Sequence, residues 1–232
     1  MSKTLAPTAV GIFEESLVIT PAGTRVTSRS VNLAGEGDPI PGCTTTGTDG
    51  IAVCRSFQPL VMFVGGALDV KFRPMIRGFE DYDRVNESKQ DIGYVSWNRD
   101  AALFAIALHW RAQGQKIVLI GHSMGGAKAH AVSKRLSDAG HDVELLVTLD
   151  PVFNRGAQPK PARVKTWRNI HVDYARAAGS TTSPNGIARL GGPWQNCPGA
   201  DTNVVFWDIG QDAHAKAEEM FEYFRSEVEA VI

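Results

Sequence analysis

Runs of consecutive apolar residues alternate along this chain with segments in which apolar side chains recur every three or four positions. The first run, residues 60–64, is apolar throughout, which is typical of a strand buried on both faces of a parallel sheet. Similar runs predict five more strands, at residues 92–97, 116–120, 142–149, 163–172 and 204–207.

The segments between these runs predict helices. Pro74 opens one of them, since proline is favoured at the first helical position. Asn98 is placed to cap a second helix, and residues 124–138 form a third. The apolar stripes of the second and last helices are Leu103, Ile106, Ala107 and Trp110, and Ala217, Met220, Phe221, Phe224 and Val228. Repeated strand–helix units predict an α/β fold, a mostly parallel sheet with helices on both faces.

The first part of the chain has a different pattern. Residues 8–34 indicate an antiparallel hairpin whose two strands flank the turn Pro21-Ala22-Gly23. We interpret it as a pair of edge strands that begin the sheet; the alternative is an arm that pairs with a partner. Residues 35–58 are rich in Gly, Pro and Thr and predict a loop.

A second loop is predicted at residues 175–203, and its length indicates a functional role. No internal repeat divides the chain, and 232 residues fit one larger α/β domain. We therefore expect a single domain over residues 1–232, with the hairpin and loop in 1–57 and the core in 58–232.

The pentapeptide Gly121-His122-Ser123-Met124-Gly125 lies between a predicted strand and a predicted helix. Strand, G-x-S-x-G turn and helix together are the context of a nucleophile elbow, in which a serine hydroxyl is exposed on a sharp turn. The backbone N–H of Met124 would then lie at a helix N-terminus, where a developing oxyanion is stabilised. The pattern predicts Ser123 as a nucleophile.

A serine nucleophile needs a base, and the base needs an acid that orients it. Asp150 ends a predicted strand and is favoured as the acid over Asp173, which closes the next one. The chain order Ser, Asp, His leaves His171 and His214 as candidate bases. We favour His214, at a loop-to-helix position, because His171 lies within a strand.

A second oxyanion donor is expected from the loop after the first apolar strand. Gly65, Gly66 and Ala67 occupy that position, and glycine lets the backbone approach a substrate closely. No histidine, cysteine or carboxylate spacing in the sequence matches a metal motif, and we expect neither a metal nor a cofactor.

Charge and composition narrow the classes of partner. Lys and Arg number 24 against 25 Asp and Glu, a net charge of -1, which argues against a nucleic-acid partner. The longest apolar run, residues 101–108, is too short for a transmembrane segment. The N-terminus has no signal-peptide pattern, so we expect a cytoplasmic protein or one exported by a signal-independent system.

Three cysteines leave the redox state open. Cys43 and Cys54 bracket a Thr- and Gly-rich loop and could form a disulfide, with Cys197 left free. Three unpaired thiols are the equal alternative.

The elbow, the Leu149-Asp150-Pro151 segment and the Gly65-Gly66 loop together resemble the α/β-hydrolase superfamily, in particular small lipase-like serine hydrolases. The resemblance covers roughly residues 58–225; it includes no lid insertion, and nothing in 1–57 matches it. It implies Ser123, Asp150 and His214 as nucleophile, acid and base, with the acid one strand earlier than is common in the superfamily. The group is also similar to bacterial lipase effectors, which implies lipid substrates and an immunity protein as partner.

These observations lead to one expectation of function. The chain is predicted to be a serine ester hydrolase that forms an acyl-enzyme, with a lipase, phospholipase or esterase activity. A thioesterase, or a binding module that keeps the fold without catalysis, is the alternative.

Overall fold

The computed structural model describes residues 58–67, 69, 73–86, 89–153 and 159–231, together with the backbone of four short strands within the first 57 residues. Among these residues, six strands form one sheet in which every neighbouring pair is parallel. They are β5 (Leu60–Gly65), β6 (Asp91–Ser96), β7 (Ile117–His122), β8 (Val143–Leu149), β9 (Val164–Val172) and β10 (Thr202–Phe206). Across the sheet they lie in the order β10-β9-β8-β7-β5-β6.

Helices connect these strands and follow the last one. They are α3 (Pro74–Asn86), α4 (Asp100–Ala112), α5 (Met124–Asp138), α6 (Pro184–Gly191), α7 (Ala217–Glu222) and α8 (Arg225–Glu229). Two short 3-10 turns are η1 (Trp97–Arg99) and η2 (Ala213–Ala215).

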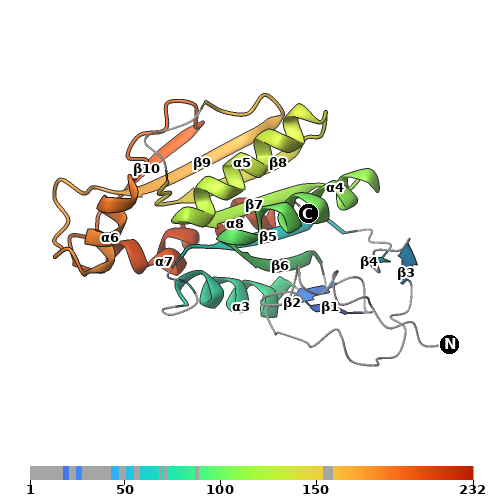
Figure 1. The fold of residues 1–232 in the computed structure, drawn as a ribbon, viewed down its shortest axis with the longest axis horizontal. Helices are drawn as coiled ribbons and strands as arrows, with labels where there is room; N and C mark the ends of the chain where they lie inside the picture. Colours follow the sequence, from blue (N-terminus) through green and yellow to red (C-terminus); the bar gives the residue numbers. More distant parts are fainter. Residues whose placement is uncertain are drawn as a thin grey trace.

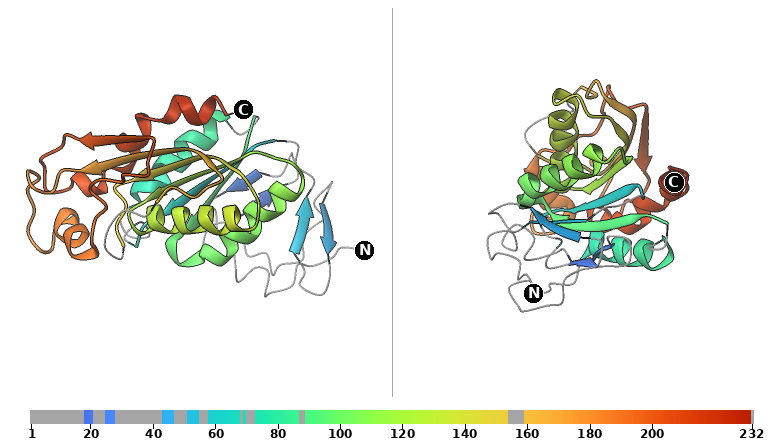
Figure 2. Two further views of the ribbon diagram at one scale, coloured as in Figure 1. Left: turned by 90° about the horizontal axis from the view of Figure 1, so that it is seen from above. Right: turned by 90° about the vertical axis from the view of Figure 1, so that its right-hand side faces the viewer.

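The sheet is the middle of three layers. Helices α4 and α5 cover one face, and α3, α7 and α8 cover the other (Figure 1). The view from above in Figure 2 shows the same layers, with α6 apart from both, near the ends of β9 and β10. The predicted α/β architecture, a parallel sheet with helices on both faces, is confirmed.

Strand β5 shows why both faces need a cover. Val61 and Phe63 point into the apolar cluster formed with α3, α7 and α8. Leu60, Met62 and Val64 point into the opposite cluster, formed with α4 and α5. Because successive side chains of a strand face opposite sides, an unbroken apolar run stabilises a strand only when both sides exclude water.

The chain changes direction across the sheet at β5. It passes from β5 to β6 on one side and then returns to β7 on the other. At such a switch point a crevice forms at the carboxyl ends of the two strands, where open α/β sheets place their ligands. Gly66 follows β5 and Ser123 follows β7, so both residues lie at this point.

All six predicted strands are present, with ends displaced by no more than two residues. Helix α5 has the predicted bounds, and α3 begins at Pro74 as expected. The apolar stripes predicted for α4 and for the C-terminal segment are buried throughout.

Three local predictions are wrong. Asn98 does not cap a helix, because it lies inside η1, and α4 begins at Asp100. The last helix is divided into α7 and α8, since Phe224 N donates to Phe221 O at 2.9 Å and tightens the turn between them. The segment 175–203 contains α6, where Ser183 caps the helix by accepting from Gly186 N at 3.2 Å and Pro184 takes the first helical position.

The N-terminal hairpin has backbone strands β1 (Val18–Thr20) and β2 (Arg25–Thr27), which pair antiparallel. They form a sheet of their own, so their interpretation as edge strands of the main sheet is wrong. A second pair, β3 (Cys43–Thr46) and β4 (Ile51–Cys54), interrupts the predicted 35–58 loop. Its register sets Cys43 opposite Cys54, but their side chains, and with them the disulfide prediction, lie outside the described residues.

Across the described ranges no helix is both long enough and apolar enough to cross a membrane.

The contact between α5 and β5 leaves no room for a side chain on Gly125. A Cβ there would lie 2.2 Å from Val64 O, a backbone atom of a central strand that cannot move aside. We therefore expect Gly125→Ala to lower the free energy of unfolding by more than about 3 kcal/mol, or to give insoluble protein.

Gly78→Ala in α3 is the matched control, because its Cβ would meet nothing closer than Glu218 Cα at 3.8 Å. Helix propensity predicts that this change is neutral or stabilising by up to about 1 kcal/mol. Urea denaturation of both variants tests the contact, and equal stability of the two would contradict it.

Candidate active site

Ser123 lies on a sharp turn between β7 and α5. Its backbone has φ 58° and ψ -130°, a conformation that costs a non-glycine residue of the order of 1–3 kcal/mol. Backbone hydrogen bonds fix this geometry, since Ser123 N donates to Leu149 O at 3.0 Å and Ser123 O accepts from Val152 N at 3.1 Å. The turn is therefore held between β8 and the segment that follows it.

Two glycines provide the space that this turn needs. A Cβ on Gly121 would lie 2.4 Å from Gly125 O, so only glycine allows the strand and the helix to meet at this angle. A Cβ on Gly66 would lie 2.6 Å from Ser123 Cβ, so the loop after β5 runs directly against the serine side chain. Strained turns of this kind concentrate at functional sites.

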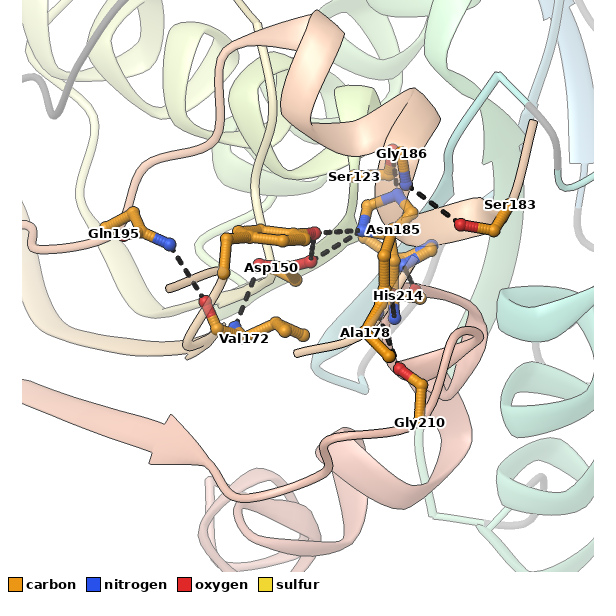
Figure 3. Close-up of polar contacts among 12 residues, drawn as sticks. Ser123, Asp150, Val172, Ala178, Ser183, Asn185, Gly186, Gln195, Gly210 and His214 are labelled. Atoms are coloured by element: carbon orange, nitrogen blue, oxygen red, sulfur yellow. Dashed lines mark hydrogen bonds and ion pairs between the residues drawn. The ribbon is translucent and has the colours of Figure 1, made fainter. Parts of the chain in front are cut away.

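Ser123, His214 and Asp150 form a buried chain of hydrogen bonds (Figure 3). The Ser123 hydroxyl donates to His214 Nε2 over 2.9 Å, and His214 Nδ1 donates to Asp150 Oδ2 over 2.5 Å. Their exposed fractions are 7%, 4% and 0%, so bulk water does not compete for these bonds. The three side chains come from the ends of β7 and β8 and from η2.

Asp150 has its own network of donors. Its Oδ1 accepts from Val172 N at 3.0 Å, and its Oδ2 accepts from the Tyr174 hydroxyl as well as from His214. Burial, followed by the neighbouring Asp150 charge, raises the pKa of Tyr174 above its usual value. The phenol thus stays protonated and serves as a donor to the carboxylate.

His122, next to the serine, is held as a neutral imidazole. Its Nε2 donates to His214 O at 2.7 Å, and the two rings pack with centroids 4.8 Å apart. Burial lowers the pKa of His122 to about 3, with a smaller effect of His214 in the same direction. The interaction supports the 3-10 turn that carries His214.

The competing residues occupy other positions. His171 is the penultimate residue of β9, where burial lowers its pKa, and Ser123 is bonded to His214 instead. Asp173 accepts from Ala175 N at 3.0 Å and stabilises the turn after β9. Asp173 is therefore explained by local structure.

The four residues predicted to bind an oxyanion have different surroundings. Met124 is the first residue of α5, whose N-terminal N–H groups have no carbonyl partner within the helix. Gly66 lines the pocket in front of Ser123, and Ala67 is exposed beside it. Gly65 is the last residue of β5, and its Cα faces the Asp69 and Tyr94 side chains.

The pocket at Ser123 is small, with a cavity volume of about 10 Å³, room for about one water molecule. Its walls are short or polar side chains from several elements, namely Gly66, Asp69, Pro74, His122, Ser123, Pro184, His214 and Ala215. Asp69 accepts from Met75 N at 2.6 Å and from the Tyr94 hydroxyl, and burial raises its pKa. This carboxylate ties the loop after β5 to α3 and β6.

Within the described ranges no group of three or more His, Cys, Asp and Glu residues could hold a metal ion. Cys197 is a free and fully buried thiol, and burial raises its pKa to about 12. It is therefore not a reactive thiolate.

Three polar residues of the site were not predicted from the sequence: Tyr174, Asn185 and the neutral His122. Asn185 Oδ1 accepts from His214 N at 2.8 Å, and Figure 3 shows its side chain beside the base. Its only local signal is the Ser183-Pro184 helix start just before it, which locates α6 but not the contact.

No protein-family model and no curated protein matches this chain. Three solved structures that it resembles are hydrolases. A protein described as a hydrolase of the α/β superfamily, from Xanthomonas campestris, is 14% identical, with 75% of this chain and 99% of that chain covered and a TM-score of 0.49. The lipase BlEst2 of Bacillus licheniformis is 13% identical, with 75% and 92% covered and a TM-score of 0.48.

The third structure is the type II thioesterase BorB of the borrelidin biosynthetic cluster, 14% identical, with 76% of this chain and 94% of that chain covered and a TM-score of 0.47. These three matches are thus named as a hydrolase of the α/β superfamily, a lipase and a thioesterase, and this is what the chain is similar to. At such low identity the activity has to be argued from the site itself.

The depressed pKa of His122 predicts a pH-dependent stability. The unfolded chain binds a proton at His122 below about pH 6.5, whereas the folded protein does so only near pH 3. The free energy of unfolding should therefore fall as the pH is lowered through this window, by at most about 1.4 kcal/mol per pH unit from this group.

His122→Gln keeps a side-chain N–H donor but does not titrate. Its stability, measured by urea denaturation between pH 4 and 6, should fall less steeply with decreasing pH than that of the wild type. Parallel slopes for the two proteins would show that His122 is not buried in the neutral form.

Proposed function

We propose that this protein is a serine hydrolase that cleaves carboxylic esters through an acyl-enzyme. One observation carries the proposal: the buried chain of hydrogen bonds from Ser123 Oγ through His214 to Asp150. A serine hydroxyl bonded to a neutral imidazole, itself oriented by a carboxylate, is the arrangement that activates serine as a nucleophile.

In the proposed reaction His214 Nε2 takes the Ser123 proton while Oγ attacks the ester carbonyl carbon. Asp150 holds Nδ1 and stabilises the imidazolium that forms. The carbonyl oxygen becomes negative, and the N–H groups of Met124, Gly66 and Ala67 are the proposed donors to it. The C–O bond then breaks, and the alcohol leaves with the proton from His214.

Water completes the cycle. His214 deprotonates it, the hydroxide attacks the acyl carbon, and the acid leaves as Ser123 recovers its proton. The strained backbone of Ser123 and the buried polar chain argue against a binding module without catalysis, since both are costly and a binding role needs neither.

The class of substrate is proposed from exposed apolar side chains on two segments that carry site residues or lead to them. Helix α6 contributes Pro184 to the pocket wall and carries Leu190, which is 79% exposed. The segment between β10 and η2 carries Trp207 and Ile209, each 67% exposed. Exposed apolar side chains on α6 and on the segment that leads to His214 support a lipid-like ester over a small polar one. A thioester is the alternative substrate, because the same groups cleave it.

Two further assignments stay predictions. One is the single domain over residues 1–232, with the catalytic core in 58–232. The other is the immunity protein that the sequence resemblance implies as a partner.

Replacing the nucleophile tests the proposed chemistry. Ser123→Ala should retain the wild-type melting behaviour and lose at least about 10⁴-fold of the hydrolysis of a short p-nitrophenyl ester, because the remaining groups cannot form an acyl-enzyme. Wild-type rates in this variant would contradict the proposal.

Two histidine variants identify the base. His214→Ala should lose activity to a similar extent, and His171→Ala should keep it, since of these two histidines it is His214 that is bonded to Ser123. Loss of activity in His171→Ala alone would show that the assignment of the base is wrong.

The proposed substrate class predicts a dependence on acyl length. The double variant Leu190→Ser, Trp207→Ser should lose activity on long-chain esters and phospholipid vesicles, yet keep the wild-type rate on soluble short-chain esters. Val85→Ser is the matched control, since Val85 is 58% exposed but lies at the far end of α3. Equal effects on long and short esters would contradict a lipid-like substrate, and a thioester panel measures the alternative.

A further inference from the structure

The short helix α6 approaches the proposed catalytic groups from outside the parallel sheet, and two of its side chains point toward them. Asn185 and Arg189 are four residues apart and therefore lie on the same face of the helix. Each of them bonds to a segment that carries a member of the Ser123–His214–Asp150 chain or its direct partner.

Asn185 is fully buried and uses its whole side-chain amide. Its Oδ1 accepts from His214 N at 2.8 Å. Its Nδ2 donates to Ala178 O and to Gly210 O, each at 2.7 Å (Figure 3). One buried amide thus joins the base, the loop after β9 and the loop after β10, and a buried amide is costly unless all its bonds are made.

Arg189 acts on the acid through Tyr174. Its Nη2 donates to Tyr174 O at 3.0 Å and also to Ala177 O, and its Nη1 donates to Gly179 O at 3.2 Å. The guanidinium lies 5.6 Å from the centroid of the Tyr174 ring. These contacts hold the phenol where it donates to Asp150 Oδ2, and its oxygen is 3.1 Å from His214 Nδ1.

We infer that α6 is a clamp that positions both the base and the acid of the site. Asn185 is the positioning residue for the His214 backbone, and Tyr174, held by Arg189, is the positioning residue for Asp150. This inference rests on the proposed function, since it assigns roles within that reaction.

Tyr174 also tunes the base in this arrangement. Its hydroxyl withdraws charge from Asp150 Oδ2, the same oxygen that accepts the His214 Nδ1 proton. Without that donor the carboxylate carries more charge toward the imidazole, and the protonated form of His214 is stabilised. The pH above which the base is neutral should therefore increase.

The other groups around His214 do not replace this effect. His122 faces it from β7 as a neutral ring, and Asp69 lies across the pocket, where its own donors are Tyr94 and Met75 N. On its own segment, Lys216 is paired with Asp208 at 2.5 Å. The bonds of Asp69 to Tyr94 and Met75 N and the ion pair of Lys216 with Asp208 do not involve Tyr174, so they stay the same in Tyr174→Phe.

The test compares kcat and KM over a range of pH in four variants of the full chain. Tyr174→Phe should move the acidic limb of kcat/KM upward by about 0.5 to 1 pH unit.

Asn185→Ala should lower kcat by about 10- to 100-fold with little change in KM, because it displaces the base without removing a substrate contact.

Matched controls are Tyr82→Phe and Asn86→Ala. Tyr82 is a fully buried tyrosine whose hydroxyl donates to Gln90, and Asn86 is a buried amide bonded to Tyr82 O and Glu229, both in the distant half of α3. Each control should lose as much thermal stability as its partner while keeping the wild-type kcat and pH profile.

Different results would contradict the proposed function and the clamp. If the wild-type protein hydrolyses none of the esters, the proposed function is wrong. If the wild type is active but Tyr174→Phe has the pH profile of Tyr82→Phe, or Asn185→Ala has the kcat of Asn86→Ala, the clamp is wrong and the proposed function stands.

Discussion

The site depends on one close backbone contact, where the first turn of α5 meets the ends of β5 and β7. Gly125 lies against the carbonyl oxygens of Val64 and Gly65 with no space for a Cβ. This contact forces the chain to turn sharply after β7 and sets Ser123 at positive φ. It also brings the Gly66 loop against the serine side chain, so nucleophile and proposed oxyanion donors are arranged by the same packing.

The sheet supplies only part of the site. Ser123 and Asp150 directly follow the neighbouring strands β7 and β8, and their relative position follows from the parallel register. His214 lies on a 3-10 turn outside the sheet, and polar contacts hold it there: His122 bonds its carbonyl and Asn185 its N–H. Buried hydrogen bonds therefore fix the position of the base, whereas the strands fix the positions of the nucleophile and the acid.

The regular part of the fold could be predicted from the sequence because its determinants are local. The apolar run at 60–64 is explained by a strand buried on both faces, and the residues of α5 have their predicted bounds. The Ser183-Pro184 start of α6 is an equally local signal. The segment 175–203 was predicted as a loop from its composition alone, and this missed the helix. The division of the last helix comes with the tight hydrogen bond from Phe224 N to Phe221 O, which periodicity does not reveal.

The supporting residues of the site could not be predicted. Tyr174 meets Asp150 across 24 positions and Asn185 meets His214 across 29, and no spacing rule links such pairs. The sequence does predict Ser123, Asp150 and His214, because the motif, the strand ends and the chain order limit where a nucleophile, an acid and a base can lie. Tyr174 has no comparable signal, since a tyrosine two residues after a strand is common on structural grounds.

The central claim, that Ser123 is an activated nucleophile, is tested most directly by a fluorophosphonate, which reacts covalently with activated serines. Peptide mass mapping of the treated wild-type protein should find one adduct, on Ser123, and His214→Ala should remain unlabelled although Ser123 is present. An unlabelled wild-type protein, or an adduct on another residue, would contradict the account.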